Sequence, residues 1–426
     1  MTADPTRRLE ADGAPDRRMR IAVIVNMVAP YTKPLFEELA RRDECELLVV
    51  SETPMERDRH WSPEVELPFQ HVLLDSWTLD LAPLAVGSGF KTRFDTYVYV
   101  PKRPLRPLEE FAPDVVVAAG GGIWSSPANI AALAARGRRD WAVATWWGSF
   151  TRPHPTLPRR LADPWVKYFM RTVDACMPYG QRHVKDLTEM GVDPARMVLA
   201  PITALTPEHP PARGPARSGD ETRFLYVGRF IERKGIETLL EAFRLGGLGE
   251  LHLVGDGPQL ETVQRSAAND SRIRLSGHLS GQALSQAYAE ADALIVPSLY
   301  EAWGLVVHEG LAHGLPVITT DQVGAADDLI DPGVNGYVVP AGSAEALAEA
   351  MRALAGWTQE QHDRSAHRSG ETLERCSFER GADGFVKGSA VALAHHERQR
   401  RGRRRSPGAR SSNGSEPARR PTEGSS

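Results

Sequence analysis

Two pairs of charged residues in the second half of the chain have the types and order to bind a ligand that carries both phosphates and hydroxyl groups. Arg229 and Lys234 lie in a short basic loop between an apolar run and an amphipathic stretch. Glu301 and Glu309 lie around the start of a later amphipathic stretch. Basic side chains neutralise phosphates, and ionised carboxylates accept hydrogen bonds from vicinal hydroxyls. These residue types favour a substrate-holding site.

The first loop, Gly228–Gly235, is placed where an anion would bind. The apolar run Phe224–Val227 predicts a strand before it, and apolar residues at helical spacing predict a helix from Ile236 onward. Free N–H groups and the helix dipole favour negative charge at a helix start. The two basic side chains could therefore neutralise a leaving diphosphate. The alternative is a basic loop that is simply solvated.

The second segment, Tyr300–Pro316, combines the two glutamates with a predicted strand-to-helix turn. A strand ends at Pro297 and Gly304 opens a helix, where the backbone N–H groups of Gly304 and Leu305 could hold a diphosphate. An acid/base pair of a glycoside hydrolase and a solvated helix face are the alternatives. The apolar residues around Glu309 argue against the solvated face, because an unpaired buried carboxylate is costly. Nothing else in the chain indicates a hydrolase.

The remaining motifs do not indicate a cofactor. Neither the turn at 255–258 nor the run at 119–124 has the GxGxxG spacing of a nicotinamide-binding fold. The three cysteines are too far apart in sequence for a disulfide framework or a metal-ligand set, and no Asp-x-Asp motif stands where it could hold a metal. We therefore expect no cofactor and no metal ion.

The charged loops are positioned by a regular alternation of apolar runs and amphipathic stretches. This alternation predicts an α/β fold with parallel sheets covered on both faces. The predicted strands are Ile21–Val25, Leu47–Val50, Asp114–Ala118, Ala142–Thr145, Phe224–Val227, Leu251–Val254, Ala293–Val296 and Val317–Thr319. In such folds ligands bind beyond the carboxyl ends of the strands, where both charged loops fall.

A run dense in Pro, Gly and Ala divides the chain in two. Residues 201–219 lack a periodic pattern and are typical of an interdomain linker. They separate a predicted N-terminal domain over 19–200 from a C-terminal domain over 220–374, with a cleft between the two as the natural ligand site. Irregular spacing between about residues 51 and 107 predicts variable loops rather than core in the first domain.

The ends of the chain differ in composition from the domains. Residues 1–18 lack the apolar segment of a secretory signal and predict a disordered leader. Residues 399–426 hold eight Arg against two Glu and no aromatic residue, which predicts a disordered basic tail that is solvated or contacts an anionic surface.

The charge and hydropathy of the whole chain bound its location and partners. The net charge of −4 leaves an acidic body beside the basic tail, which argues against nucleic acid as a partner. No apolar run is long enough to span a bilayer. We expect a cytoplasmic protein, with peripheral contact at the inner membrane face as a second possibility.

The second half of the chain resembles the retaining glycosyltransferases of the GT-B fold, specifically glycosyltransferase family four. The resemblance rests on G-R-x(4)-K-G at 228–235, G-D-G-P at 255–258, Gly277-His278-Leu279, and the E-x(7)-E spacing of Glu301 and Glu309. It implies two Rossmann-like domains whose parallel sheets face a central cleft. It also implies transfer of a sugar, with retention, from a nucleotide diphosphate sugar to an acceptor hydroxyl. A UDP-sugar is the first expectation and a GDP-sugar the second.

The resemblance implies roles for individual residues on the donor side. Arg229 and Lys234 would bind the donor diphosphate, Glu301 would contact the transferred sugar, and Glu309 would hold the ribose. The catalytic residues would then be Arg229, Lys234 and Glu301. The other implied donor contacts are Gly228, His278 and Leu279 toward the nucleotide, and Ala302, Trp303, Gly304 and Leu305 beside the sugar, with Trp303 where the family usually has Phe.

The first half of the chain resembles the family far less. Pro30 and Tyr31 follow the first predicted strand, and Trp147 and Gly148 follow a later one, so these four are the predicted acceptor-side residues. Many relatives have a histidine at the second place, whereas the nearest here is His154 in a Pro-flanked loop. We therefore assign no catalytic histidine and favour a structural or acceptor-shaping role for Trp147 and Gly148.

The expected partners are a nucleotide sugar donor and an acceptor that could be a small molecule, a lipid-linked molecule or a glycan, with the oligomeric state left open. Residues 159–173 could meet a membrane surface, although packing within the first domain is the commoner explanation. The resemblance also implies that a helix over 375–398 crosses back onto the first domain. A sugar-nucleotide epimerase that needs no acceptor and a non-catalytic sugar-nucleotide-binding module are the alternative functions.

Overall fold

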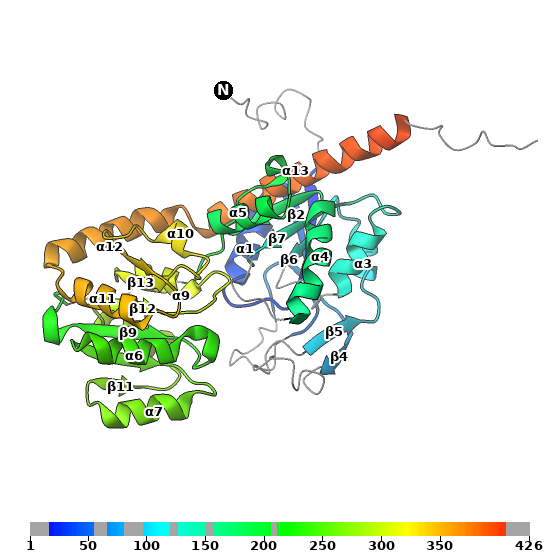
Figure 1. Ribbon diagram of the computed structural model, residues 1–426. Coiled ribbons are helices and arrows are strands. Elements are labelled where there is room, and N and C mark those ends of the chain that lie inside the picture. Colours follow the sequence, from blue (N-terminus) through cyan, green and yellow to red (C-terminus); the bar gives the residue numbers. More distant parts are fainter. Residues whose placement is uncertain are drawn as a thin grey trace, which may run out of the picture.

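The computed structural model describes residues 17–54, 66–80, 97–119, 127–149, 157–205, 211–212 and 214–405 of the chain. These residues form two α/β domains that lie side by side, the first on the right and the second on the left of Figure 1. Each domain contains one six-stranded sheet, and every neighbouring pair of strands in both sheets is parallel. The predicted α/β class with two parallel sheets is confirmed.

The first domain has the strand order β3-β2-β1-β6-β7-β8. Its sheet strands are β1 (Met19–Val25), β2 (Cys45–Ser51), β3 (Gln70–Leu73), β6 (Val115–Ala119), β7 (Ala142–Trp147) and β8 (Ala175–Pro178). Its helices are α1 (Lys33–Arg41), α2 (Arg106–Phe111), α3 (Pro127–Ala135), α4 (Leu157–Thr172) and α5 (Gln181–Glu189).

The second domain repeats this order as β11-β10-β9-β12-β13-β14. Its strands are β9 (Arg223–Val227), β10 (Glu250–Val254), β11 (Ile273–Leu275), β12 (Ala293–Val296), β13 (Val317–Thr320) and β14 (Gly336–Val339). Its helices are α6 (Ile236–Gly246), α7 (Leu260–Asn269), α8 (Gly281–Glu290), α9 (Leu305–Ala312), α10 (Ala326–Leu329), α11 (Ala344–Ala355) and α12 (Gln359–Glu374). In such a sheet the strand order reverses between β9 and β12, and a ligand crevice opens beyond their carboxyl ends.

All eight strands predicted from the apolar runs are present, but the prediction of loops alone between residues 51 and 107 is wrong. That segment supplies β3, which pairs in parallel with β2, and an antiparallel hairpin of β4 (Ser76–Asp80) and β5 (Tyr97–Pro101). The run Gln70–Leu73 is short, and none of its residues is fully buried. An edge strand of this kind has no continuous apolar run by which it could be recognised.

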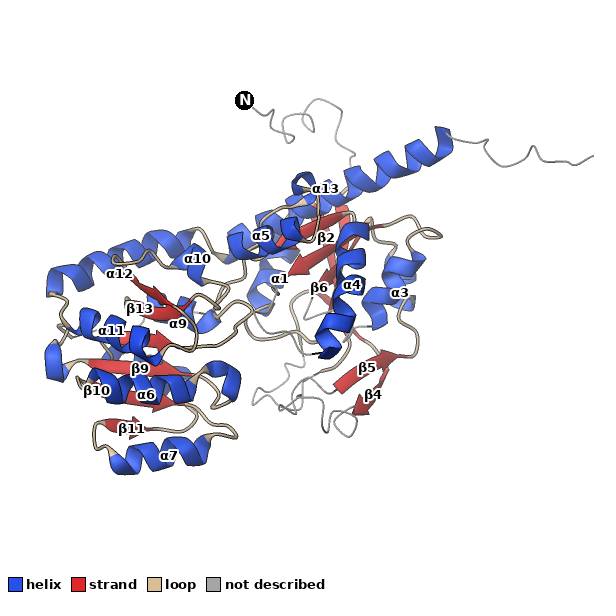
Figure 2. Ribbon diagram, viewed as in Figure 1, coloured by secondary structure: helices blue, strands red, loops and turns tan. Residues whose placement is uncertain are grey.

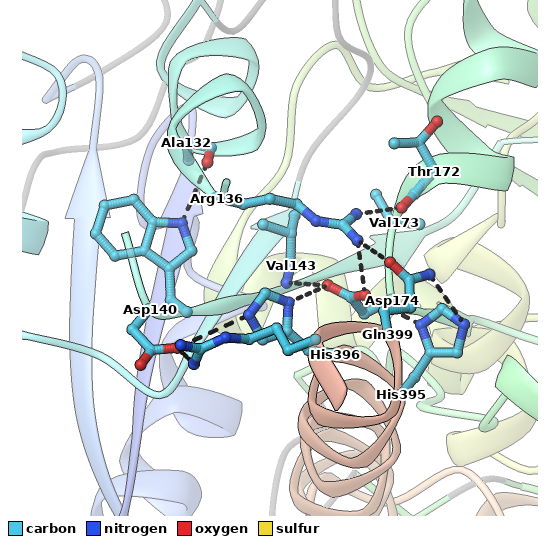
Figure 3. Close-up of polar contacts among 12 residues, drawn as sticks. Ala132, Arg136, Asp140, Val143, Thr172, Val173, Asp174, His395, His396 and Gln399 are labelled. Atoms are coloured by element: carbon cyan, nitrogen blue, oxygen red, sulfur yellow. Dashed lines mark hydrogen bonds and ion pairs between the residues drawn. The ribbon is translucent and has the colours of Figure 1, made fainter. Parts of the chain in front are cut away.

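The last described helix, α13 (Phe378–Arg405), leaves the second domain and packs on the first (Figures 1 and 2). It contacts α1, β7 and β8, so the crossing helix is present as predicted. The predicted start of the disordered tail at residue 399 is wrong, because the helix continues to Arg405. Gln399 bonds to Arg136 (Figure 3), and Arg400 pairs with Asp140, so these residues are held against the first domain.

Other parts of the predicted organisation are only partly covered by the described residues. The leader over 1–18 lies outside them except for Arg17 and Arg18, which pair with Asp114 and Asp43. The tail beyond Arg405 also lies outside. In α4, Val166 and Phe169 are buried in the core of the first domain, which favours packing over membrane contact for that helix. Among the helices described, none combines the length and apolar character needed to cross a bilayer.

Candidate active site

The basic loop after β9 lies against the end of β12. Gly235 ends this loop with a φ of 68°, and a Cβ atom there would lie 2.0 Å from the carbonyl oxygen of Pro297. A side chain therefore cannot be accommodated, and glycine allows the two strand ends to meet. The close approach brings Arg229 and Lys234 beside the loop that carries Glu301, as the sequence predicted.

Glu301 is the centre of an ion cluster at this junction. Lys234 Nζ bonds to its Oε2, and Arg233 Nη1 lies 3.2 Å from the same oxygen. Arg233 also ties the loops together through the backbone, since its carbonyl oxygen accepts a 2.8 Å bond from the N–H of Leu299. The side chains of Lys234 and Glu301 are 16% and 15% exposed, so the cluster is largely screened from bulk water but keeps some contact with it.

The charges in this cluster shift each other's ionisation. Burial disfavours the Glu301 carboxylate, but the attraction of Lys234 and Arg233 outweighs it and holds the pKa of Glu301 below its usual value. Burial also lowers the pKa of Lys234, and the neighbouring carboxylate opposes that effect. A carboxylate beside two cations, near a helix start, is an environment suited to binding further negative charge.

Glu309 lies on α9, which follows the loop of Glu301, and its carboxylate bonds to a neutral side chain rather than to a cation. Its Oε2 accepts a 2.6 Å hydrogen bond from the hydroxyl of Tyr288 on α8. Burial raises the pKa of Glu309, while the Tyr288 bond and the charge of Lys234 act in the opposite direction. Lys234 therefore acts electrostatically on both predicted glutamates, which places all three in one site.

The start of α9 lies at the residues where the sequence predicts an anion to bind. Gly304 caps the helix with a φ of 102°, and Leu305 is its first residue, so both stand at the helix N-terminus as expected. Ala302 and Trp303 instead face the first domain: the Ala302 carbonyl bonds to His183 Nε2 at 3.0 Å, and Trp303 is 4% exposed. The Trp303 ring therefore packs between the domains, and the place of its loop beside the transferred sugar stays a prediction.

An aromatic cluster explains why Ala302 and Trp303 face the first domain. The Trp303 ring lies 6.2 Å from Tyr179 and 5.8 Å from His183, centroid to centroid. Burial lowers the pKa of His183 to about 4, so at neutral pH the ring is uncharged and its Nε2–H donates to the Ala302 carbonyl. The loop of Glu301 thus contacts α5 of the first domain.

The glycine-rich turn at 255–258 fixes the basic loop through backbone hydrogen bonds. The N–H of Gly228 donates to Val254, and the N–H of Phe230 donates to Asp256, at 3.0 and 2.8 Å. Gly255 in turn donates to the carbonyl of Gly277 at 2.7 Å, so the segment that leads to His278 and Leu279 is fixed at the same edge of the sheet. These contacts give the turn a structural role.

The predicted acceptor-side residues divide into two groups. Pro30 and Tyr31 follow β1 and are partly exposed. Trp147, by contrast, is 4% exposed and packs in the core of the first domain, and Gly148 lies so close to the Tyr179 ring that a Cβ atom would overlap it. Both therefore have packing roles. His154 lies outside the described residues.

One contact joins the acceptor-side loop to the donor-side loop. The hydroxyls of Ser149 and Tyr300 lie 3.2 Å apart, although the two residues belong to different domains. A second link passes through the predicted linker, where the Thr203 hydroxyl lies 3.0 Å from His308 Nδ1 on α9. The loop of Glu301 and the helix of Glu309 are thus both in contact with residues outside the second domain.

Two residues of the site were not predicted from the sequence. Arg233 stands beside Lys234 in the same basic loop, so its charge was visible but its partner was not. Tyr288 lies in an amphipathic stretch well before the glutamates, and only the packing of α8 on α9 shows that its hydroxyl reaches Glu309. Within the described ranges, no group of three or more His, Cys, Asp or Glu side chains is arranged to hold a metal ion.

Each domain matches a known protein family. Residues 221–356 match the family described as glycosyl transferases group 1, and residues 28–203 match the glycosyl transferase 4-like domain. The lipopolysaccharide 1,6-galactosyltransferase of Salmonella typhimurium is 30% identical over 149 residues, which are 33% of this chain and 42% of that protein. The chain thus spans less than half the length of the curated relatives that it matches.

Solved structures share the fold over most of the chain. The apo form of the lipopolysaccharide outer core galactosyltransferase WaaB has a TM-score of 0.62 and 18% identity. The match covers 87% of this chain and 99% of that chain. Anabaena Alr3699/HepE in complex with UDP has a TM-score of 0.61 and 14% identity, covering 87% and 99%. At these identities the likeness establishes the fold.

Proposed function

We propose that this chain, which belongs to the GT-B glycosyltransferases through both of its domains, transfers a sugar from a nucleotide diphosphate sugar to an acceptor hydroxyl with retention of configuration. The observation that carries the proposal is the cluster of Lys234 and Arg233 on Glu301, beside the N-terminus of α9 and within electrostatic reach of Glu309. A UDP-sugar is the preferred donor, and the UDP bound by Anabaena HepE supports this choice.

The chemistry follows from where negative charge develops. As the bond from the anomeric carbon to the phosphate oxygen breaks, the diphosphate gains charge, and Arg229, Arg233 and Lys234 stabilise it together with the free N–H groups at the start of α9. The acceptor oxygen bonds to the same face of the anomeric carbon, and its proton passes to the leaving phosphate oxygen. Glu301 holds the transferred sugar and Glu309 the ribose.

The positive charges of the site would perform the neutralisation for which other phosphate sites use a divalent cation. We therefore propose that turnover needs no metal, and we expect it to persist in EDTA. Loss of activity in EDTA that is restored by Mg²⁺ or Mn²⁺ would contradict this part of the proposal. The acceptor would enter from the first domain near Pro30 and Tyr31 and would be a small molecule, a lipid-linked molecule or a glycan, in the cytoplasm or at the inner face of the membrane.

Nucleotide release from a panel of UDP-sugars and GDP-sugars, with candidate acceptors, tests the proposal. The wild type should release nucleotide only with the right pair, and NMR of the product should show the anomeric configuration of the donor. Glu309→Ala should abolish turnover, whereas Glu349→Ala, an exposed glutamate on α11, should not change it. An inverted product would overturn retention, and near-normal turnover of Glu309→Ala would overturn the site.

The same measurements separate the two alternative functions. A sugar changed in the absence of any acceptor would indicate an epimerase. Nucleotide binding without turnover against every acceptor would indicate a binding module.

A further inference from the structure

The Glu309 carboxylate is supported from α8 by a side chain that lies outside the predicted donor contacts. Tyr288 is 1% exposed, and its hydroxyl donates a 2.6 Å hydrogen bond to Glu309 Oε2. A buried phenol requires a partner for its hydroxyl, and here that partner is the carboxylate proposed to hold the ribose. One carboxylate oxygen is thereby fixed, which leaves the other to accept hydrogen bonds from a ligand.

Tyr288 is itself held in place by His313, the residue that ends α9. The two rings stack with centroids 4.6 Å apart and an interplanar angle of 17°. His313 Nδ1 lies 2.7 Å from the carbonyl oxygen of Glu309, and its Nε2 lies 2.9 Å from the hydroxyl of Ser285 on α8. Stacking fixes the plane of the phenol, and the two polar contacts fix the plane of the imidazole.

The contacts of His313 assign its tautomer. A carbonyl oxygen can only accept, so Nδ1 carries the proton and donates to Glu309. In the neutral ring Nε2 is then the acceptor, and the Ser285 hydroxyl donates to it. The chain of contacts runs in one direction, from Ser285 to His313 and, through the stacked rings, to Tyr288 and the Glu309 carboxylate.

The type of partner also separates Glu309 from Glu301. Glu301 faces an ammonium and a guanidinium, which neutralise it. Tyr288 is a neutral donor that orients the carboxylate without cancelling its charge, so Glu309 remains a strong acceptor for hydroxyl groups. A ribose offers two vicinal hydroxyls, which can donate hydrogen bonds to an oriented carboxylate. A phosphate is negatively charged, so the ribose is the better partner for Glu309.

We propose that Tyr288 is a positioning residue that aligns Glu309 for the ribose diol of the donor nucleotide, with His313 and Ser285 as its support. The inference rests on the proposed function, because it assigns the ligand group that Glu309 receives. Its consequence is selective: loss of the phenol hydroxyl should weaken recognition of the ribose hydroxyls and leave recognition of the diphosphate unchanged.

Calorimetric titration of the full chain with UDP and with 2′,3′-dideoxyuridine diphosphate tests this selectivity, with GDP and its dideoxy analogue if the wild type prefers GDP. Tyr288→Phe keeps the stacked ring and removes the hydroxyl. It should weaken UDP binding about tenfold, the usual scale for one hydrogen bond to a charged group, and leave binding of the dideoxy compound unchanged. In a Glu309→Ala background the same substitution should have no further effect on UDP.

Tyr337→Phe is the matched control, because the Tyr337 hydroxyl also has a buried ring partner, Trp357 Nε1 at 3.1 Å, but lies away from the site. It should bind both nucleotides like the wild type. Ser285→Ala should reduce UDP affinity less than Tyr288→Phe and in the same selective way. The ¹⁵N shifts of His313 should show a proton on Nδ1, which checks the geometry in every variant that folds.

Four results would count against these assignments, and they are distinguishable. Equal loss of both nucleotides in Tyr288→Phe, or no loss of UDP, would overturn the positioning role. Equal wild-type affinity for UDP and its dideoxy analogue would overturn the ribose contact of Glu309, and the positioning role with it. A wild type that binds neither UDP nor GDP would overturn the proposed function itself.

Discussion

Glu301 and Asp174 are two screened carboxylates, each bonded to basic side chains, and they differ in what surrounds the remaining oxygen atoms. Glu301 lies at the cleft and is 15% exposed, with Lys234 and Arg233 on one oxygen. Asp174 is 0% exposed and lies beside the first residues of β7, where its oxygens bond to Arg136, to His395 and to the N–H of Val143 (Figure 3). We call the first the open cluster, because its carboxylate keeps some contact with solvent, and the second the closed cluster, because its carboxylate has none.

The difference shows how similar ion clusters acquire different roles. Asp174 joins three elements that are distant in sequence, since Arg136 follows α3, Val143 lies on β7, and His395 lies on α13. Its bonds to Arg136 and Val143 lie within the first domain, and its bond to His395 holds the crossing helix to that domain. The two cations on Glu301 each remain partly exposed, at 16% for Lys234 and 39% for Arg233, so a second anion could still reach them. We therefore expect substitutions in the first cluster to affect activity and substitutions in the second to affect stability.

The largest effect should follow from Asp174→Ala. Removing the carboxylate leaves the Arg136 guanidinium, which is 13% exposed, without its main partner. Breaking a buried pair in this way costs about 3–5 kcal/mol of unfolding free energy. Urea unfolding should show this loss, while nucleotide binding per folded molecule stays near the wild-type value.

Asp174→Asn sharpens this test because it keeps an acceptor for the Val143 N–H and removes only the charge. It should lie between the wild type and the alanine variant in stability. If Asp174→Ala instead reduced nucleotide affinity while its unfolding curve matched the wild type, the closed cluster would have to be assigned to function.

Lys234→Ala should instead reduce activity and leave stability nearly unchanged, and its effect should be somewhat smaller than that of Asp174→Ala. Loss of one preorganised charge at the developing diphosphate should lower kcat/KM by about 10²–10³-fold. Thermal unfolding should change little, because Glu301 keeps Arg233 as a partner and can be reached by water. Lys387→Ala, an exposed lysine on α13, is the control. A Lys234→Ala variant that is unstable but turns over normally when folded would remove the distinction between the clusters.

The two clusters also differ in how far the sequence could predict them. The open cluster follows two strand-to-helix turns in the centre of the second sheet, where β9 and β12 are apolar runs with glycines and charges directly after them. Local pattern was therefore sufficient to find Lys234, Glu301 and Glu309. The closed cluster depends on residues from separate elements, and nothing near Asp174 in the sequence indicates Arg136 or His395.

The same contrast holds for the fold. The eight strands predicted from apolar runs are the four central strands of each sheet, whereas the four edge strands, β3, β8, β11 and β14, were not among them. Edge strands here have three or four residues, and their burial depends on what packs over them, as α13 packs over β8. The packing of Trp303 was also not predictable from its own segment, because its environment is made by Tyr179 and His183 of the other domain.

Acid should affect the closed cluster through His396. Burial lowers the pKa of His396 in the folded chain, and Asp174, at 3.6 Å from its Nδ1, opposes that effect only partly. The unfolded chain then binds the proton more readily, so the contribution of His396 to stability is present above its ordinary pKa of 6.5 and is lost as the pH falls below it. The slope should stay under about 1.4 kcal/mol per pH unit, the limit for one proton.

Urea unfolding of the wild type and of His396→Phe at several pH values between 5 and 8 measures this slope. The phenyl ring fills the buried position without titrating, so the variant should lose part of the decline in acid. An identical pH dependence in both proteins would show that His396 does not couple the closed cluster to pH.

The smallest effect should come from Arg233→Ala, which tests how much each of the two cations on Glu301 contributes to stabilising the diphosphate. Arg233 bonds to Glu301 as Lys234 does, but its side chain is 39% exposed against 16%, so solvent screens its charge more strongly. We expect a loss in kcat/KM of roughly tenfold, smaller than for Lys234→Ala, because the screened charge stabilises the diphosphate less. The loss should shrink further at high salt, whereas the Lys234 effect should persist. If the two variants were equally impaired at every salt concentration, exposure would not be what ranks these cations, and both would have to contact the ligand directly.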